Sequence, residues 1–235
     1  MDGFLNFISG LDFSPLWISL KTGAVATVIS FFLGIFAARL VLSANGRLRT
    51  VLDGLLTMPL VLPPTVAGFI LLRIFSLKRP AGEFLYRELG IKVVQTWLGC
   101  IIAAVIISFP LMYRNARAAF EQIDETLIGA ARTLGVSERE IFWKIRMPLA
   151  KPGILSGTVL TFARSLGEYG ATAMLAGNIS GKTSTISQRI AMVIQDGDYA
   201  TAGFWVVVIV VIAFVVIVGL DLVMRGGKHV SGSKD

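Results

Sequence analysis

The sequence is poor in cysteine, histidine and charged side chains, and each shortage excludes a class of protein or site. Cys100 is alone, which excludes an intramolecular disulfide and a cysteine metal cluster. His229 is also alone, which excludes a metal site built from several histidines. Charged residues make up 16% of the chain, whereas a soluble domain has about a quarter. The composition therefore disfavours a cytosolic enzyme, a disordered chain and a collagen.

Long uncharged stretches dominate the chain instead. Hydrophobic residues make up 54% of the 235 residues, and the mean hydropathy is +0.74. A helix needs about 20 apolar residues to cross a bilayer, and four stretches come close to or exceed that length: residues 22–38, 54–72, 93–113 and 199–220. A fifth, 152–176, contains Arg164 and Glu168 but is too apolar all round for a soluble amphipathic helix. The sequence predicts an all-α membrane protein, with about five transmembrane helices in a single domain of residues 1–235.

The basic residues predict how these helices are oriented. Residues 1–16 contain two aspartates and no basic residue, which is not the start of a cleaved signal peptide. If the N-terminus lies outside, thirteen lysines and arginines lie on the inner side and eight on the outer side. Basic residues gather on the cytoplasmic side of membrane proteins. We therefore expect a multi-pass protein of a bacterial inner membrane with a cytoplasmic C-terminus, and we relate the net charge of +7 to that face rather than to nucleic acid.

Residues 114–151 form the longest predicted cytoplasmic loop. Residues 125–134 read as a short helix, which Gly135 ends in the left-handed conformation. Ser137 then starts a second helix, with Glu140 three residues later as a capping box. The apolar face of that helix consists of Ile141, Phe142 and Ile145, and Pro148 is expected to end it. Two short helices around a glycine also occur in DNA-binding proteins. With seven basic and five acidic residues, however, this loop is not strongly positive, so docking of a protein partner is favoured.

Residues 129–154, which begin in this loop and end just after it, contain GAARTLG and then MPLAKPGI. This pattern resembles the cytoplasmic coupling loop of ABC-importer permeases. The resemblance implies that the contacts with an ATPase come from Ala130, Ala131, Leu134, Gly135 and Pro148. The family usually has a carboxylate at the head of the motif, where this chain has Ile128 and Gly129, so that contact is absent or moved to Asp124 or Glu125.

Three further segments, MPLVLPPTVAGFILL, SFPLMYRNARAAFE and FARSLGEYGATAMLAGNISGKTSTI, resemble the permease subunits of molybdate importers. The resemblance implies a type I importer permease (MetI-like) fold and a homodimer of permease subunits in membrane lipid. It also implies cytoplasmic ATPase subunits that use the ATP, and a periplasmic molybdate-binding protein. No cofactor is expected on this chain. Sulfate, thiosulfate or tungstate permeases remain alternatives, as does a stand-alone secondary anion transporter of another class.

The second uncharged stretch contains three prolines within six residues, Pro59, Pro63 and Pro64. Proline removes a helical hydrogen bond, and a broken backbone is tolerated inside a membrane only where protein or a water-filled cavity satisfies it. A simple kink is the alternative. We predict a discontinuous segment that lines the translocation path, with the hydroxyls of Thr57 and Thr65 as donors to an anion.

Arg164 and Glu168 are four residues apart, so on a continuous helix they share one face. Ionisable residues inside a membrane are expensive and mark functional sites by default. A path or gate role and a structural ion pair are both open. Gly167 and Gly170 flank Glu168 and permit a bend or a close helix approach.

The outer segment 183–198 is expected to be an amphipathic helix. Its apolar face consists of Ile186, Ile190, Val193 and Ile194. The preceding residues 177–183 are one residue short of a phosphate-binding loop and lie on the predicted outer side. We therefore expect no ATP site, no catalytic group and no metal site in this chain.

Overall fold

The computed structural model describes residues 9–229, with side chains up to residue 219. Residues 1–8 and 230–235, which contribute to the predicted orientation, lie outside the described residues. The helices are α2 (Ser14–Ser43), α3 (Gly46–Val61), α4 (Pro64–Phe75), α5 (Pro80–Leu89), α6 (Trp97–Glu121), α7 (Glu125–Thr133), α8 (Glu138–Glu140), the π-helical turn η1 (Ile141–Arg146), α9 (Met147–Leu166), α10 (Gly170–Ala176), α11 (Ile186–Gln195) and α12 (Tyr199–His229). This part of the chain contains no strand.

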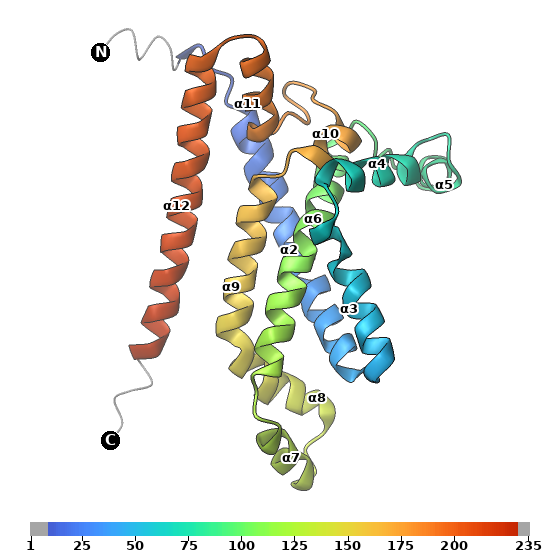
Figure 1. Ribbon diagram of the computed structural model, residues 1–235, viewed down its shortest axis with the longest axis vertical. Helices are drawn as coiled ribbons and strands as arrows, with labels where there is room; N and C mark the ends of the chain where they lie inside the picture. Colours follow the sequence, from blue (N-terminus) through green and yellow to red (C-terminus); the bar gives the residue numbers. More distant parts are fainter. Residues whose placement is uncertain (1–8, 230–235) are drawn as a thin grey trace.

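Five helices run along the long axis in alternating directions: α2, α3, α6, α9 and α12 (Figure 1). The helix α7 lies at one end of this bundle and α11 at the other. Three helices, α2, α6 and α12, are long and apolar enough to cross a membrane, and the bent pair α3–α4 gives a fourth. The 20-residue α9 packs against α2 and α6 and runs alongside them, but it is not among the helices that are apolar enough to count as spans. The predicted all-α membrane fold is confirmed, with three or four of the roughly five predicted spans meeting the length and hydropathy of a membrane helix in the described part of the chain.

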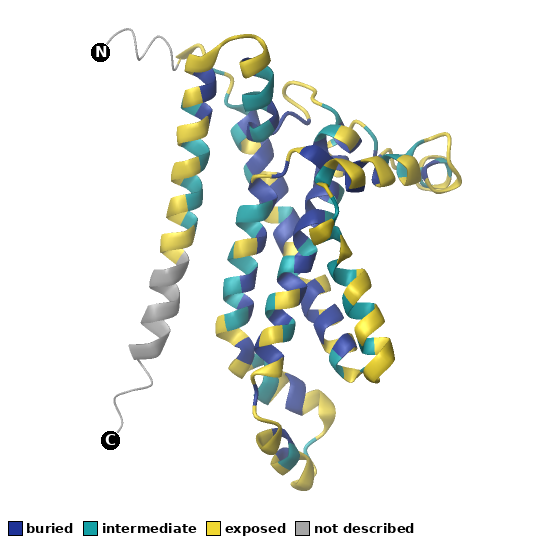
Figure 2. Cartoon of the chain, viewed as in Figure 1, coloured by how far each residue is buried: buried dark blue, intermediate teal, exposed yellow. Residues whose placement is uncertain are grey.

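Small residues let α2, α6 and α9 pack closely at the centre of the bundle. A Cβ added at Gly34 of α2 would lie 2.7 Å from Cγ of Met112 on α6. One added at Gly153 of α9 would lie 2.6 Å from Cβ of Ala119. Lipid is as apolar as leucine, so close backbone approach supplies much of the attraction between helices in a membrane. Figure 2 shows the resulting buried faces of these helices, the largely exposed α3 and the largely exposed part of α12 up to residue 219.

The second predicted span is broken, as the prolines indicate. The helix α3 ends at Val61 and α4 begins at Pro64, with an angle of 108° between them. Leu62 and Pro63 have extended ψ angles of 137° and 134°. Pro59 lies inside α3 and does not end it. The predicted discontinuity is therefore confirmed, and its position is set by Pro63 and Pro64.

The predicted fifth span, residues 152–176, is wrong as one continuous helix. The helix α9 ends at Leu166, and α10 begins at Gly170 with a separate axis (Figure 1). The cause is Glu168, whose Oε1 accepts a hydrogen bond of 2.8 Å from the backbone N–H of Ala171. Glu168 lies one residue before the N-cap Tyr169, and its carboxylate takes the place of a backbone carbonyl as the acceptor for the Ala171 N–H in the first turn of α10. Glu168 thus lies between two helices, not on the same helical face as Arg164.

The prediction that Pro148 ends a helix is also wrong. Helical backbone continues from α8 through η1 into α9, and Pro148 lies in the first turn of α9. The N–H of Met147 bonds to the carbonyl of Phe142, five residues back. Proline normally clashes with the preceding turn. The wider π turn just before Pro148 gives its ring room, so the helix continues.

Segment 183–198 contains the predicted amphipathic helix, α11. Thr185 and Gln188 form a capping box at its start. Ile186 and Val193 are buried, as predicted. Ile194 is 44% exposed, so it does not belong to the buried apolar face. The helix α12 follows and contacts mainly α11.

Candidate translocation path and coupling surface

The two helix breaks, about one hundred residues apart in sequence, meet in the structure. A Cβ at Gly170 would lie 3.1 Å from both Cβ of Pro64 and the backbone N of Thr65. A Cβ at Gly68 would lie 2.6 Å from Cα of Ala171. The first turns of α4 and α10 are therefore in van der Waals contact, and glycine on each helix permits this approach. We call this contact region the break junction.

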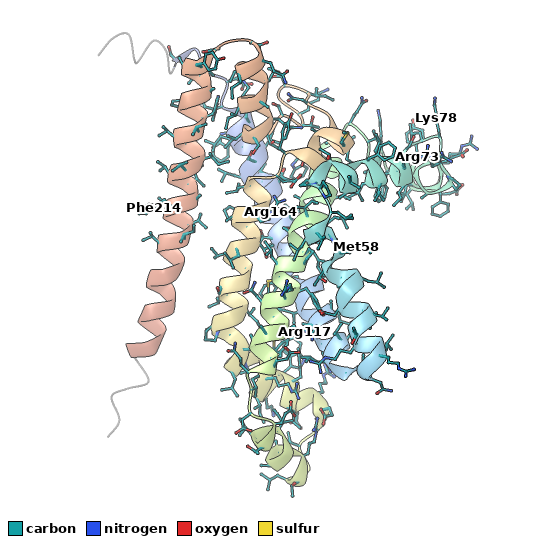
Figure 3. All side chains as sticks on the ribbon, viewed as in Figure 1. Met58, Arg73, Lys78, Arg117, Arg164 and Phe214 are labelled. Atoms are coloured by element: carbon teal, nitrogen blue, oxygen red, sulfur yellow. The ribbon has the colours of Figure 1, made fainter. Side chains whose placement is uncertain are left out.

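Glu168 supplies the charge of the break junction and is almost fully buried, with 2% of its side chain exposed. Its Oε2 lies 3.0 Å from Nη1 of Arg164, while its Oε1 accepts from Ala171. Arg164 is 33% exposed and lies on α9 near its end (Figure 3). The carboxylate is thus neutralised by one cation and satisfied by one backbone donor, as a buried charge requires. The structure brings this predicted pair together across a helix end.

The other predicted path residues separate into two groups. Pro63, Pro64, Thr65 and Gly170 lie at the break junction, and Thr65 is exposed there. Thr57 and Pro59 lie one to two turns earlier on α3. The hydroxyl of Thr57 donates to the carbonyl of Asp53 at 2.6 Å, so it must give up this bond to donate to an anion. At Gly167, an added Cβ would meet nothing closer than 3.9 Å, so no close approach depends on that glycine.

The predicted coupling loop projects beyond the bundle as α7, α8 and η1 (Figure 1). Gly135 has φ +77° and forms the Schellman arrangement, with Gly135 N–H bonded to Arg132 O and Val136 N–H to Ala131 O. Ser137 accepts from the N–H of Glu140 at 3.3 Å, the first half of the predicted capping box, and its hydroxyl donates to the Glu140 carboxylate. The predicted helix–glycine–helix unit is therefore confirmed.

One face of this unit packs on the bundle and the other is open. Buried apolar residues fix the inner face: Ile128, Ala131, Ile141 and Phe142. The open face exposes Leu134 by 82%, Trp143 by 57% and Leu149 by 53%. Of the predicted contact residues, Ala130, Leu134, Gly135 and Pro148 are exposed, whereas Ala131 is buried. Several large apolar side chains exposed on one short unit, rather than a single one, are typical of a surface that another protein covers.

The two carboxylates considered as substitutes for the missing acid of the motif have different roles. Asp124 caps α7 by accepting from the N–H of Thr126 at 2.8 Å, and hydrogen bonding from the Thr126 side chain and then from its N–H lowers the pKa of Asp124. Glu125 lies 3.2 Å from Arg146 and remains 70% exposed. Glu125 is therefore the carboxylate that is available to a partner protein.

A polar cluster that the sequence reasoning missed joins α3 to α6. Tyr113 donates to Asp53 Oδ1 at 2.8 Å, and Arg117 forms ion pairs with Asp53 and with Glu121. Arg49 forms a further ion pair with Glu121. Because α3 has no buried residue, this cluster is a major contact that fixes its position. The lone acid at the edge of an apolar stretch, Asp53, is the signal that was available in the sequence.

Several proteins of known family are similar in sequence to most of this chain. It is 40% identical over 205 residues to the putative molybdenum transport system permease protein YvgM of Bacillus subtilis, covering 87% of this chain and 90% of the relative. It is 43% identical over 184 residues to the molybdenum transport system permease protein ModB of Escherichia coli, covering 78% and 80%. The sulfate transport system permease protein CysT of Salmonella typhimurium is 33% identical over 216 residues, covering 92% and 78%.

The fold is also found in a solved transporter. An inward-facing crystal structure of the MetNI methionine ABC transporter contains a chain that matches with a TM-score of 0.71 at 19% identity, covering 90% of this chain and 94% of that one. This likeness supports the MetI-like fold alone. The model of the family described as binding-protein-dependent transport system inner membrane component matches residues 30–225. The chain therefore belongs to this family of inner-membrane transport components.

Proposed function

We propose that this chain is the permease subunit of an ATP-driven importer that carries molybdate across the bacterial inner membrane. Two copies would form the path, and separate cytoplasmic ATPase subunits would dock on the α7 end. A periplasmic molybdate-binding protein would deliver the anion at the α11 end, with the N-terminus outside and the C-terminus in the cytoplasm. Tungstate has nearly the same size and charge, so it would share the path.

The break junction is the observation that carries this proposal. It brings together extended backbone, an exposed threonine and a carboxylate paired with an arginine at a helix break. Such backbone is tolerated in a membrane where it lines a cavity. An oxyanion requires hydrogen-bond donors, and a transporter must also release it, so weak donors suit this task. The similarity to two molybdenum permeases supports molybdate as that oxyanion.

Uptake into sealed vesicles tests the proposal. Vesicles that contain the complete complex should take up labelled molybdate when ATP is supplied on the ATPase side, and a large excess of sulfate should compete poorly. The matched control lacks the binding protein. Efficient sulfate uptake with no response to molybdate would instead assign the chain to the sulfate permeases, the group that contains its relative CysT.

A stand-alone secondary anion transporter is the second candidate. Uptake by vesicles that contain this chain alone, driven by an ion gradient and without ATP, would support it. The open apolar face around Leu134 argues against it, because a transporter without an ATPase partner has no need of such a surface.

A further inference from the structure

A cavity of about 740 Å³ opens at the α11 end, away from the break junction. Its walls come from the first turns of α2 and α6 and from the loop before α11. Trp17 and Lys21 of α2, Trp97 of α6, Gln95 and Lys182 are among the residues that line it. Tryptophan and lysine together are typical of the level where the bilayer meets water. The composition of the cavity wall is therefore that expected at the level of lipid headgroups.

The cavity has unpaired positive charge. Lys21 and Lys182 are exposed, and neither forms an ion pair with the described side chains. No acidic residue is among those that line the cavity in the described part of the chain. The nearby carboxylate of Asp12 is occupied by Ser14 and Ser180. An anion bound here would meet two ammonium groups and little opposing charge.

Gln95 is held in this wall by a costly backbone conformation. Its φ is +58°, the one positive φ of a non-glycine residue among residues 9–229. Its N–H bonds to the carbonyl of Leu175 at 3.1 Å, which fixes the conformation. Strained residues of this kind occur at binding sites, where the surrounding structure maintains them. The fixed backbone positions the Gln95 side chain at the cavity.

An exposed apolar stripe continues along α2 below Lys21. It consists of Ala24, Val28, Phe32 and Phe36, which recur at helical spacing. At 1.5 Å per residue, the stripe from Lys21 to Phe36 is about 22 Å long. One leaflet contributes about half of the roughly 30 Å of hydrocarbon. The stripe is therefore long enough for the acyl chains of a single lipid, whereas a free oxyanion would have no use for it.

We propose that this cavity binds the phosphate of an anionic phospholipid, with Lys21, Lys182 and Gln95 at the headgroup and the acyl chains on the α2 stripe. The proposal depends only on residence in a membrane. Its failure would leave the proposed transport function unchanged, and failure of molybdate uptake would leave this site unchanged.

Native mass spectrometry of the full chain tests the headgroup contact. The purified chain in neutral detergent is titrated with phosphatidylglycerol and, separately, with phosphatidylcholine. Phosphatidylglycerol should bind more tightly, and each of Lys21→Gln and Lys182→Gln should weaken it about fivefold, with about 30-fold for the double variant. Lys78→Gln, which removes an exposed lysine from a distant loop (Figure 3), is the matched control and should bind as the wild type does. Equal affinity in the double variant and the control would overturn the proposal.

A second pair of variants tests the acyl contact. Phe32 on the stripe and Phe214 on α12 are both 66% exposed. Phe32→Ala should weaken phosphatidylglycerol binding severalfold and Phe214→Ala should not. Millimolar inorganic phosphate or molybdate should fail to displace the lipid. Displacement by either ion, or equal effects of the two phenylalanine variants, would identify a plain anion site and refute the lipid proposal.

Discussion

The ion pair at the break junction predicts an unequal response to neutralising its two members. Glu168→Gln removes the carboxylate but keeps an amide oxygen that accepts from the N–H of Ala171. It leaves Arg164 unpaired, and that guanidinium is 33% exposed, so water compensates part of the loss. Arg164→Gln leaves a carboxylate that is 2% exposed, with Ala171 as its remaining donor. The arginine variant should therefore be the more damaged of the two.

The magnitudes follow from burial. Removing one partner of a buried ion pair costs about 3–5 kcal/mol, and we expect about 4 kcal/mol for Arg164→Gln. For Glu168→Gln we expect a smaller loss of stability, about 2 kcal/mol. This variant weakens one charge-assisted hydrogen bond and leaves a cation that is partly solvated. The double variant carries two neutral amides that are able to bond to each other. We expect it to lose about 3 kcal/mol, which is a coupling of about 3 kcal/mol between the sites.

The measurement is a double-mutant cycle scored on two quantities. The first is the amount of folded complex that survives graded heating in detergent, and the second is molybdate uptake by vesicles with equal amounts of complex. A structural pair predicts normal uptake by the folded double variant, and a gate role predicts assembly with poor uptake. Losses that simply add, or a larger loss for Glu168→Gln than for Arg164→Gln, would refute the pairing argument.

Three further predictions concern the glycines and the energy source. Gly135→Val should reduce co-purification of the ATPase and uptake while membrane insertion remains intact, because φ +77° is strained for a β-branched residue; Gly135→Asn is the tolerated control. Gly68→Ala should lower the thermal stability of the permease, since its Cβ would lie 2.6 Å from Cα of Ala171, whereas Gly167→Ala should not change it. The purified chain should hydrolyse no ATP until partner subunits are added, and turnover by the chain alone would contradict the proposed division of labour.

Where a single residue type fixes the backbone, sequence reasoning located the feature. Pro63 and Pro64 break the second span because proline lacks the N–H that a helix needs, and Gly135 ends α7 because glycine adopts positive φ without strain. Pro148 shows the limit of this rule. Its effect depends on the π turn before it, and nothing in the local sequence distinguishes that turn from an ordinary helix.

The break at Glu168 was missed because hydropathy treats residues 152–176 as one apolar stretch. The break arises because the Glu168 carboxylate competes with a backbone carbonyl for the N–H of Ala171. The carboxylate is the preferred acceptor because Arg164 stabilises its charge. The meeting of α4 with α10 was also inaccessible. It depends on Gly68 and Gly170 facing each other across the fold, which is a tertiary fact.

The helix α9 connects the two parts of the site, the open apolar face of the coupling loop and the Arg164–Glu168 pair. It begins directly after η1, in the unit that carries the open apolar face, and it ends at Leu166, two residues before Glu168. Its 20 residues span about 30 Å, and its close contacts with α6 limit bending. A movement of α7, α8 and η1 along the α9 axis would therefore be transmitted through α9 to the Arg164–Glu168 pair. The link between α9 and α10 consists of residues 167–169, one ion pair and one hydrogen bond to the start of α10, so this link is where such a movement would be absorbed.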